Sequence, residues 1–329
     1  MITREFSWSS WRERAGSHFA PRDVPRLLSE VALAGLRLAA ARDRELGKFD
    51  GLDARDPDMV DVVLDLARVI GERYFRYRVE GVDNVPARGP ALLVGSHNGG
   101  LQTFDSLLTL IAIRDRFGVE RAVHPLAHDL LFQAPRLREV SEGLGILRAD
   151  HEGALEAFRR GRLVLVYPGS DLDSTRPFKD RHRIELGGRT GFLKLALRAS
   201  VPIVPVVSEG THEQFIVLTR GDELARRLGI KRWFRAEAFP IVLALPWGIV
   251  PGYLPYLPLP AQTTVRFGPP IHLPQLGADA TVDSHTLQEC YRQVEHAMQR
   301  ELDVLARGRV PFLGRPQDRR PLSDAAVRQ

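Results

Sequence analysis

Short continuous runs of apolar residues alternate along the chain with segments in which apolar residues recur every three or four positions. The runs predict buried strands, and the periodic segments predict helices of roughly ten residues. We expect strands at 76–80, 91–94, 122–127, 145–147, 163–167, 201–207, 241–245 and 263–267. We expect helices at 56–75, 106–117, 132–138, 152–160, 191–199 and 283–307. This order predicts an α/β domain with a central, mainly parallel sheet flanked by helices.

The pattern divides the chain into three parts. Residues 1–55 predict an N-terminal extension with an amphipathic helix at 27–44. Its first residues combine Trp8 and Trp11 with arginines, which suits a membrane interface or a loosely ordered tail that packs on the domain. The α/β domain is expected at 56–275, and a C-terminal helix and tail at 276–329.

Residues 239–261 carry no charge, and their number would suit a bilayer span. Six prolines in this stretch argue against a continuous helix. We therefore expect a buried strand at 241–245 followed by an apolar, proline-rich loop. Such a loop either dips into a membrane surface, lines an acyl site or packs as an ordered surface loop.

Composition narrows the class of protein. The net charge is +5, and 42 of the 46 basic residues are arginines, which bind phosphate and carboxylate well but also occur through compositional bias. No zinc-finger or RNA-binding signature is present, so no nucleic-acid partner is expected. Cys290 is the single cysteine, which excludes an internal disulfide and is consistent with a reducing cytosol. The N-terminus lacks the apolar core of a signal peptide, so we expect a cytoplasmic protein.

The strand at 91–94 runs into a loop that carries His97, and Asp105 stands near the start of the next helix. A loop at the end of a buried strand is a favoured place for chemistry in α/β folds. A histidine general base needs access to a hydroxyl proton and a group that holds its tautomer, and Asp105 could be that group. The alternative is that Asp105 caps the helix and His97 fills a turn.

The strand at 163–167 runs into a second polar loop. Gly169 and Ser170 let backbone amides approach a ligand. Arg176 and Arg183, with other basic residues near them, suit a phosphate group or form a solvated loop.

Two carboxylates in the same loop, Asp171 and Asp173, could bind a metal or pair with the arginines. Pairing is favoured, because two carboxylates without further ligands specify no particular ion. His212 follows the strand at 201–207 and could approach the same cleft.

With these loops placed, residues 75–275 resemble the glycerolipid and lysophospholipid acyltransferase superfamily. The family's blocks follow in order: a strand with a histidine and an aspartate, a short strand ending in arginine, a Phe-Pro-Glu-Gly block and an apolar Val-Pro strand. The corresponding stretches are His97 with Asp105, 143–148, 167–170 and 201–206, and the family's helix entry is matched by 187–192.

Two departures from the family pattern stand out. Seven residues separate His97 from Asp105, where the family usually has four. The glutamate of the third block is replaced by Gly169, as in the diacylglycerol-type branch. The resemblance therefore admits a neutral glycerolipid, a lysophospholipid or another lipid alcohol as acceptor.

The resemblance implies transfer of a fatty acyl group from acyl-CoA or acyl carrier protein to a lipid hydroxyl. It implies His97 as general base and Asp105 as its orienting group, without a metal or bound organic cofactor. It also implies a peripheral position on the inner face of the cell membrane. The substrate-binding residues are expected to be Asn98, Gly99, Gly100, Arg148, Gly169, Ser170, Asp171, Arg176 and Arg183.

Two other functions are compatible with the sequence. Asp171 and Asp173 resemble the Asp-x-Asp-x-Thr motif of haloacid-dehalogenase-type phosphohydrolases, although there the first aspartate follows the strand almost directly. A non-catalytic lipid-binding protein on the acyltransferase scaffold is the third interpretation.

Overall fold

The computed structural model describes residues 52–97, 104–227, 239–244, 246–252, 257–274 and 283–316. Residues 1–51 of the predicted N-terminal extension, the loop residues Asn98, Gly99 and Gly100, and the tail beyond 316 lie outside these ranges.

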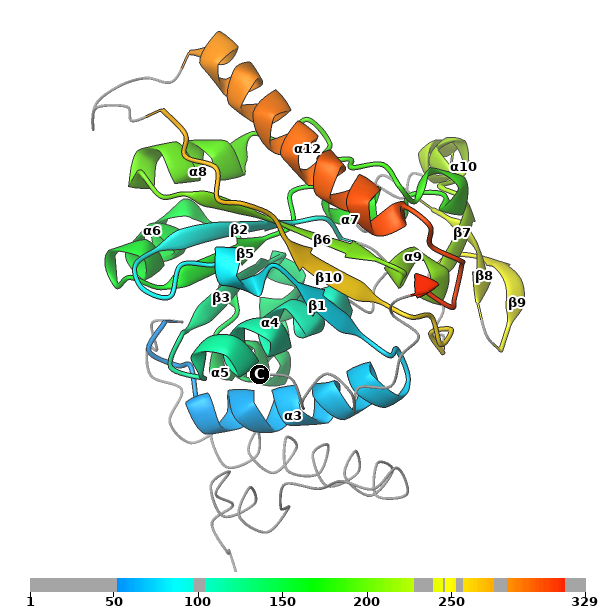
Figure 1. Ribbon diagram of the computed structural model, residues 1–329, viewed down its shortest axis with the longest axis horizontal. Coiled ribbons are helices and arrows are strands. Elements are labelled where there is room, and N and C mark those ends of the chain that lie inside the picture. Colours follow the sequence, from blue (N-terminus) through cyan, green and yellow to red (C-terminus); the bar gives the residue numbers. More distant parts are fainter. Residues whose placement is uncertain are drawn as a thin grey trace, which may run out of the picture.

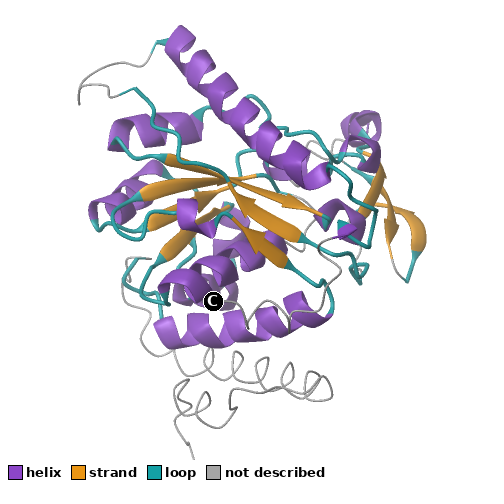
Figure 2. Cartoon of the chain, in the orientation of Figure 1, coloured by secondary structure: helices purple, strands orange, loops and turns teal. Residues whose placement is uncertain are grey.

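A seven-stranded sheet in the order β1-β10-β6-β2-β5-β3-β4 forms the centre of the described structure (Figures 1 and 2). Its strands are β1 (Arg78–Glu80), β2 (Ala91–Gly95), β3 (Val123–Ala127), β4 (Leu147–Arg148), β5 (Leu163–Val166), β6 (Ile203–Glu209) and β10 (Thr264–Phe267). Neighbouring strands run parallel except β10 and β6, which are antiparallel. The predicted mainly parallel α/β sheet is therefore confirmed, and the direction of β10 is an addition that the strand pattern did not give.

Helices cover both faces of this sheet. On one face lie α6 (His151–Arg159), α8 (Gly191–Ala199) and α12 (Ser284–Ala306), and on the other lie α3 (Pro57–Arg73) and α4 (Phe104–Phe117) (Figure 1). Leu92 and Val94 of β2 belong to the first core, and Ala91 and Leu93 belong to the second. The strand reads as a continuous apolar run because both of its faces are buried.

Local signals explain where two of the helices begin. Oδ1 of Asp56 accepts hydrogen bonds from the backbone N–H groups of Asp58 (3.0 Å) and Met59 (3.1 Å), which confirms the predicted cap of α3. The helix expected at 132–138 was misplaced: a 3-10 turn, η3 (Asp129–Phe132), precedes α5 (Pro135–Gly143). Proline suits the first position of α5 because that position needs no N–H partner.

A second, three-stranded sheet consists of β7 (Ile216–Thr219), β8 (Ile241–Ala244) and β9 (Gly248–Pro251). It follows β6 through the short helix α9 (Thr211–Gln214) and lies beside the central sheet (Figure 1). The strand expected at 241–245 was predicted to be buried, but Leu243 of β8 is 38% exposed while Val242 is 1% exposed. Part of the expected proline-rich loop is strand β9.

The remaining short elements are α7 (Ser170–Ser174), α10 (Asp222–Arg227), η2 (Val82–Asn84) and η4 (Phe178–Asp180). Within the described ranges, no helix is both long and apolar enough to cross a membrane.

Candidate active site

His97 stands two residues beyond β2, at the carboxyl edge of the parallel strands. Its Nδ1 lies 3.0 Å from Oδ2 of Asp105. The side chain of Asp105 is 2% exposed and that of His97 is 19% exposed, so the imidazole is accessible while its partner is shielded. A hydrogen on Nδ1 that points to Asp105 leaves Nε2 as the basic nitrogen, which is the tautomer a general base needs.

Asp105 owes its position to the start of α4. This helix begins at Phe104, two residues before the expected start, and so places Asp105 in its first turn. Oδ1 of Asp105 also accepts a hydrogen bond from the backbone N–H of Ser106 at 2.8 Å. A carboxylate is favoured here because the unpaired N–H groups of a helix N-terminus carry partial positive charge.

Tyr167 supports one flat side of the imidazole. The two rings are stacked with centroids 4.1 Å apart and planes inclined by 13°. A Cβ atom on Gly95 would lie 2.3 Å from the Tyr167 ring, so glycine is required at this point of β2. Gly95, Tyr167 and Asp105 together fix the orientation of His97.

Two pKa shifts follow from these surroundings. Burial opposes the charged form of His97, but the negative charge and hydrogen bond of Asp105, together with the charge of Asp173, outweigh it and raise the pKa of His97. Burial also raises the pKa of Tyr167, so its phenol stays protonated.

A buried ion pair lies behind the histidine. Oδ2 of Asp173 accepts a hydrogen bond from the backbone N–H of His97, and Oδ1 lies 2.6 Å from Nη1 of Arg176. The predicted pairing of a loop aspartate with an arginine is confirmed for these two residues. Burial raises the pKa of Asp173 to about 6, against the opposing effect of Arg176.

His212 completes this cluster. Its Nε2 lies 2.8 Å from Nη2 of Arg176. Burial and the neighbouring charge of Arg176 lower the pKa of His212 well below its usual value. A neutral imidazole therefore accepts the hydrogen bond from the guanidinium, and the cluster connects α9 to the backbone of His97.

Gly169 and Ser170 form the tight turn between β5 and α7. Ser170 has a φ of 49°, in the left-handed region. A Cβ atom on Gly169 would lie 2.4 Å from both the Cβ of Asp173 and the backbone oxygen of Glu185. The turn therefore has no room for the glutamate that the family usually carries at this place.

A polar cavity of about 480 Å³ lies next to the buried ion pair. Arg176 and Arg183 line it together with Arg220, Tyr291 and Glu295. Its size is within the range of small-molecule sites. Two of the predicted substrate-binding residues thus share one cavity, although the side chain of Arg176 is 1% exposed.

Arg148 is not brought to His97. It is exposed on β4, and the strands β5 and β3 separate β4 from β2, a distance of about 14 Å at the usual strand spacing. Its guanidinium lies 5.3 Å from the centre of the Phe132 ring. Asn98, Gly99, Gly100 and the side chain of Asp171 lie outside the described part of the structure.

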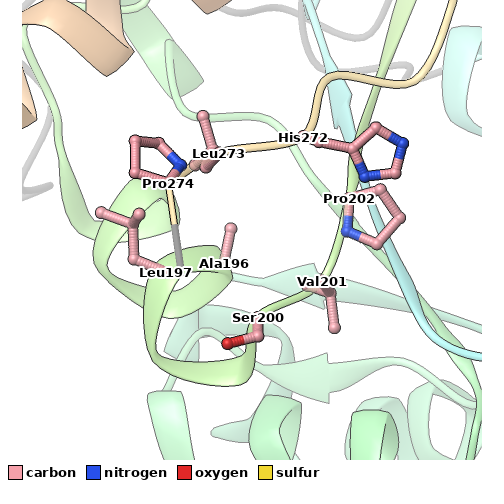
Figure 3. A pocket seen from close by; sticks show the side chains of 8 residues that line it. All are labelled: Ala196, Leu197, Ser200, Val201, Pro202, His272, Leu273 and Pro274. Atoms are coloured by element: carbon pink, nitrogen blue, oxygen red, sulfur yellow. The ribbon is translucent and has the colours of Figure 1, made fainter. Parts of the chain in front are cut away.

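A smaller cavity of about 60 Å³ lies between α8, residues 200–202 and residues 272–274. Figure 3 shows Leu197, Pro202 and His272 among the side chains around it. It is at the amino end of β6, at the opposite edge of the sheet from His97, and has room for a few water molecules.

The sequence did not reveal the stacking of Tyr167 or the contact of Asp173 with His97. The pairing of β2 with β5 would have indicated the stacking of Tyr167. Val94 of β2 lies opposite Val166 of β5, so the next residues, Gly95 and Tyr167, are neighbours across the two strands. The second depends on the turn at Gly169, which no strand pattern describes.

Several known proteins are similar to this chain. Residues 76–209 match the family model described as Acyltransferase. An uncharacterized protein of Mycobacterium tuberculosis is 32% identical over 289 residues, which cover 88% of this chain and 77% of the relative. A chicken protein named DGAT1/2-independent enzyme synthesizing storage lipids is 28% identical over 178 residues, covering 54% of this chain and 50% of the relative.

Among solved structures, the 1-acyl-sn-glycerophosphate acyltransferase PlsC of Thermotoga maritima matches with a TM-score of 0.48 and 16% identity. The match covers 86% of this chain and 95% of that one. On the family match and the similarity to the lipid-synthesising relative, this chain belongs to the acyltransferase superfamily.

Proposed function

We propose that this protein transfers a fatty acyl group from a thioester donor, acyl-CoA or acyl carrier protein, to the hydroxyl group of a lipid. The observation that carries the proposal is the 3.0 Å contact between Nδ1 of His97 and Oδ2 of Asp105, with the imidazole accessible at the carboxyl edge of the sheet. Membership of the acyltransferase superfamily supports the class of reaction, and the contact with Asp105 supports His97 as the general base.

In the proposed reaction Nε2 of His97 takes the proton of the acceptor hydroxyl as its oxygen attacks the thioester carbonyl. The new C–O ester bond forms and the C–S bond breaks. The leaving thiolate then receives the proton from the imidazolium. Asp105 stabilises the imidazolium while it carries this proton.

The acceptor is proposed to be a glycerolipid or another lipid alcohol. Gly169 stands where the family usually has glutamate, as in the diacylglycerol-type branch, and the chicken relative is named for the synthesis of storage lipids. The cavity beside Arg176 and Arg183 is proposed to hold a polar part of a substrate. A peripheral position on the inner membrane face, without a metal or bound organic cofactor, belongs to the same proposal.

The phosphohydrolase alternative is disfavoured by the position of Asp173. This carboxylate is 0% exposed and is held by Arg176 and by the backbone N–H of His97. An aspartate that attacks or protonates a phosphate ester must reach the substrate, and Asp173 instead holds the turn together.

The experiment compares wild type with His97→Ala, using acyl-CoA and acyl carrier protein in turn as donors. The acceptors are monoacylglycerol, diacylglycerol and lysophosphatidate in detergent micelles. We expect acyl transfer to fall about 10²- to 10⁴-fold, the usual contribution of a general base. Circular dichroism and thermal unfolding would show that the variant is folded.

His285→Ala is the matched control, because His285 is 77% exposed on α12. Turnover retained in folded His97→Ala would contradict the proposed base. Tight lipid binding by the wild type without turnover on either thioester would instead favour the non-catalytic lipid-binding alternative. Magnesium-dependent phosphate release from lysophosphatidate that Asp171→Asn abolishes would favour the phosphohydrolase.

A further inference from the structure

Exposed apolar side chains gather at one end of the molecule. In the described part of the chain nine large hydrophobic residues are exposed, and seven of them come from the segments that follow β6, precede β10 or follow α12. These seven are Leu218, Leu243, Trp247, Ile249, Leu257, Val310 and Leu313.

These three segments meet at the carboxyl edge of β6. β6 leads through α9 into β7, and the antiparallel β10 begins where Thr264 pairs with Glu209, the last residue of β6. The turn after α12 is held there because the backbone N–H of Phe312 donates to Oε2 of Glu213 in α9 at 2.6 Å. His97 lies at the same edge, since β2 and β6 run parallel.

The three-stranded sheet has two apolar faces. Val217, Val242 and Ala244 are buried on the inner face. On the outer face Leu243 lies opposite Ile216 of β7 and Ile249 of β9. A sheet face that meets water normally carries polar residues, so an apolar outer face indicates a surface that is covered in function.

Trp247 and a basic loop lie next to this sheet. Trp247 lies in the turn between β8 and β9 and is 54% exposed. Residues 177–183, which include η4 next to β7, carry Lys179, Arg181 and Arg183 against the single acid Asp180. Tryptophan is favoured at membrane–water interfaces, and basic residues beside an apolar surface complement anionic lipid headgroups.

We propose that the outer face of β7–β9, with Trp247 and the loop 177–183, docks on the surface of an anionic phospholipid bilayer. Docking in this way turns the carboxyl edge with His97 toward the source of lipid. The inference rests on the proposed function, because it identifies where the lipid acceptor reaches the site. The excess of positive charge in the loop 177–183, which contacts β7, favours an anionic bilayer over a protein partner.

The test measures co-sedimentation of the full chain with phospholipid vesicles. One set of vesicles contains phosphatidylcholine and phosphatidylglycerol at 3:1, and the other contains phosphatidylcholine alone. We expect Trp247→Ser combined with Ile249→Ser to weaken binding to both sets at least tenfold. Leu137→Ser is the matched control, because Leu137 is 45% exposed on α5, away from this surface, and it should bind as wild type does.

Lys179→Gln separates the electrostatic contribution. We expect binding to the phosphatidylglycerol vesicles to weaken about fivefold, the usual effect of one basic residue near an anionic surface. Binding to pure phosphatidylcholine should be unchanged. An equal loss on both sets would overturn the role given to the basic loop.

Docking and catalysis can fail separately. The double variant should keep wild-type turnover on micellar acceptors while losing vesicle binding. A wild type that binds vesicles as expected but transfers no acyl group would contradict the proposed function and leave the docking surface supported. If the double variant sediments with vesicles as wild type does, the docking proposal is overturned. It is also overturned if light scattering shows that the wild type is a dimer and the double variant a monomer, while vesicle binding is unchanged.

Discussion

Nδ1 of His97 and Oδ2 of Asp105 lie 3.0 Å apart although seven residues separate them in the chain. The contact depends on two ends of regular structure, the last residues of β2 and the first turn of α4. The length of the connection between them is therefore not what sets the distance. A chain with a longer interval than its family can keep the same pair.

Removing the charge of Asp105 should move the pH profile. Because Asp105 raises the pKa of His97, and a base must be neutral, kcat/KM of the wild type should rise with pH and level off above this raised pKa. In Asp105→Asn the acidic limb should shift to lower pH, with a plateau about 10²- to 10⁴-fold lower. Initial rates between pH 5 and 9 measure both effects, and an unshifted limb would contradict the pairing.

Ring stacking at Tyr167 predicts a difference between two substitutions. Tyr167→Phe keeps the flat ring beside His97 and should retain most of the activity. Tyr167→Leu removes the ring face and should lower kcat more than it raises KM, because the imidazole loses its support. Steady-state kinetics of both folded variants decide this, and equal kcat values would disprove a positioning role.

The buried pair of Asp173 and Arg176 predicts strong coupling. Asp173→Asn leaves the Arg176 charge uncompensated and should lower the free energy of unfolding by about 3–5 kcal/mol. Adding Arg176→Met should recover part of this loss. Urea unfolding of the two single variants and the double variant measures the coupling, and additive effects would show that the pair acts independently.

Gly169 predicts intolerance to the smallest side chain. Gly169→Ala places a Cβ 2.4 Å from the backbone oxygen of Glu185 and should cost about 1–3 kcal/mol. Gly191→Ala is the control, because a Cβ there meets no atom within 4 Å. Thermal unfolding measures the stability of the Gly169→Ala and Gly191→Ala variants. A Gly169→Ala variant as stable as Gly191→Ala would show that the turn can relax.

The sequence predicted the parallel strands well because a strand that is buried on both faces is a continuous apolar run in the sequence. The run at 163–167 is apolar without interruption since β5 is buried on both faces, and α8 spans Gly191–Ala199 as predicted. His97 stood out for the same reason, because a polar residue directly after a buried strand has a defined place at the sheet edge.

Contacts between elements far apart in the chain could not be predicted from the pattern of apolar residues. β8 was expected to be buried because Ile241 and Leu243 are apolar, yet these side chains face outward in a separate small sheet. Asp173 was expected to pair with an arginine, but its hydrogen bond from the His97 backbone also joins α7 to the residues after β2, 76 positions away in the chain. Such contacts are set by how elements assemble, which periodicity does not encode.

The position of β10 between β1 and β6 constrains the order in which the sheet can be completed. During synthesis on the ribosome β1 emerges early, but its neighbour β10 begins only at Thr264. Nη1 of Arg266 in β10 then lies 2.7 Å from Oε2 of Glu80 in β1. Until that point β1 has no strand beside it and one edge of β6 is uncovered. Nascent chains that end before about residue 264 should therefore expose unpaired backbone groups on both β1 and β6, and these chains are the states most in need of a chaperone.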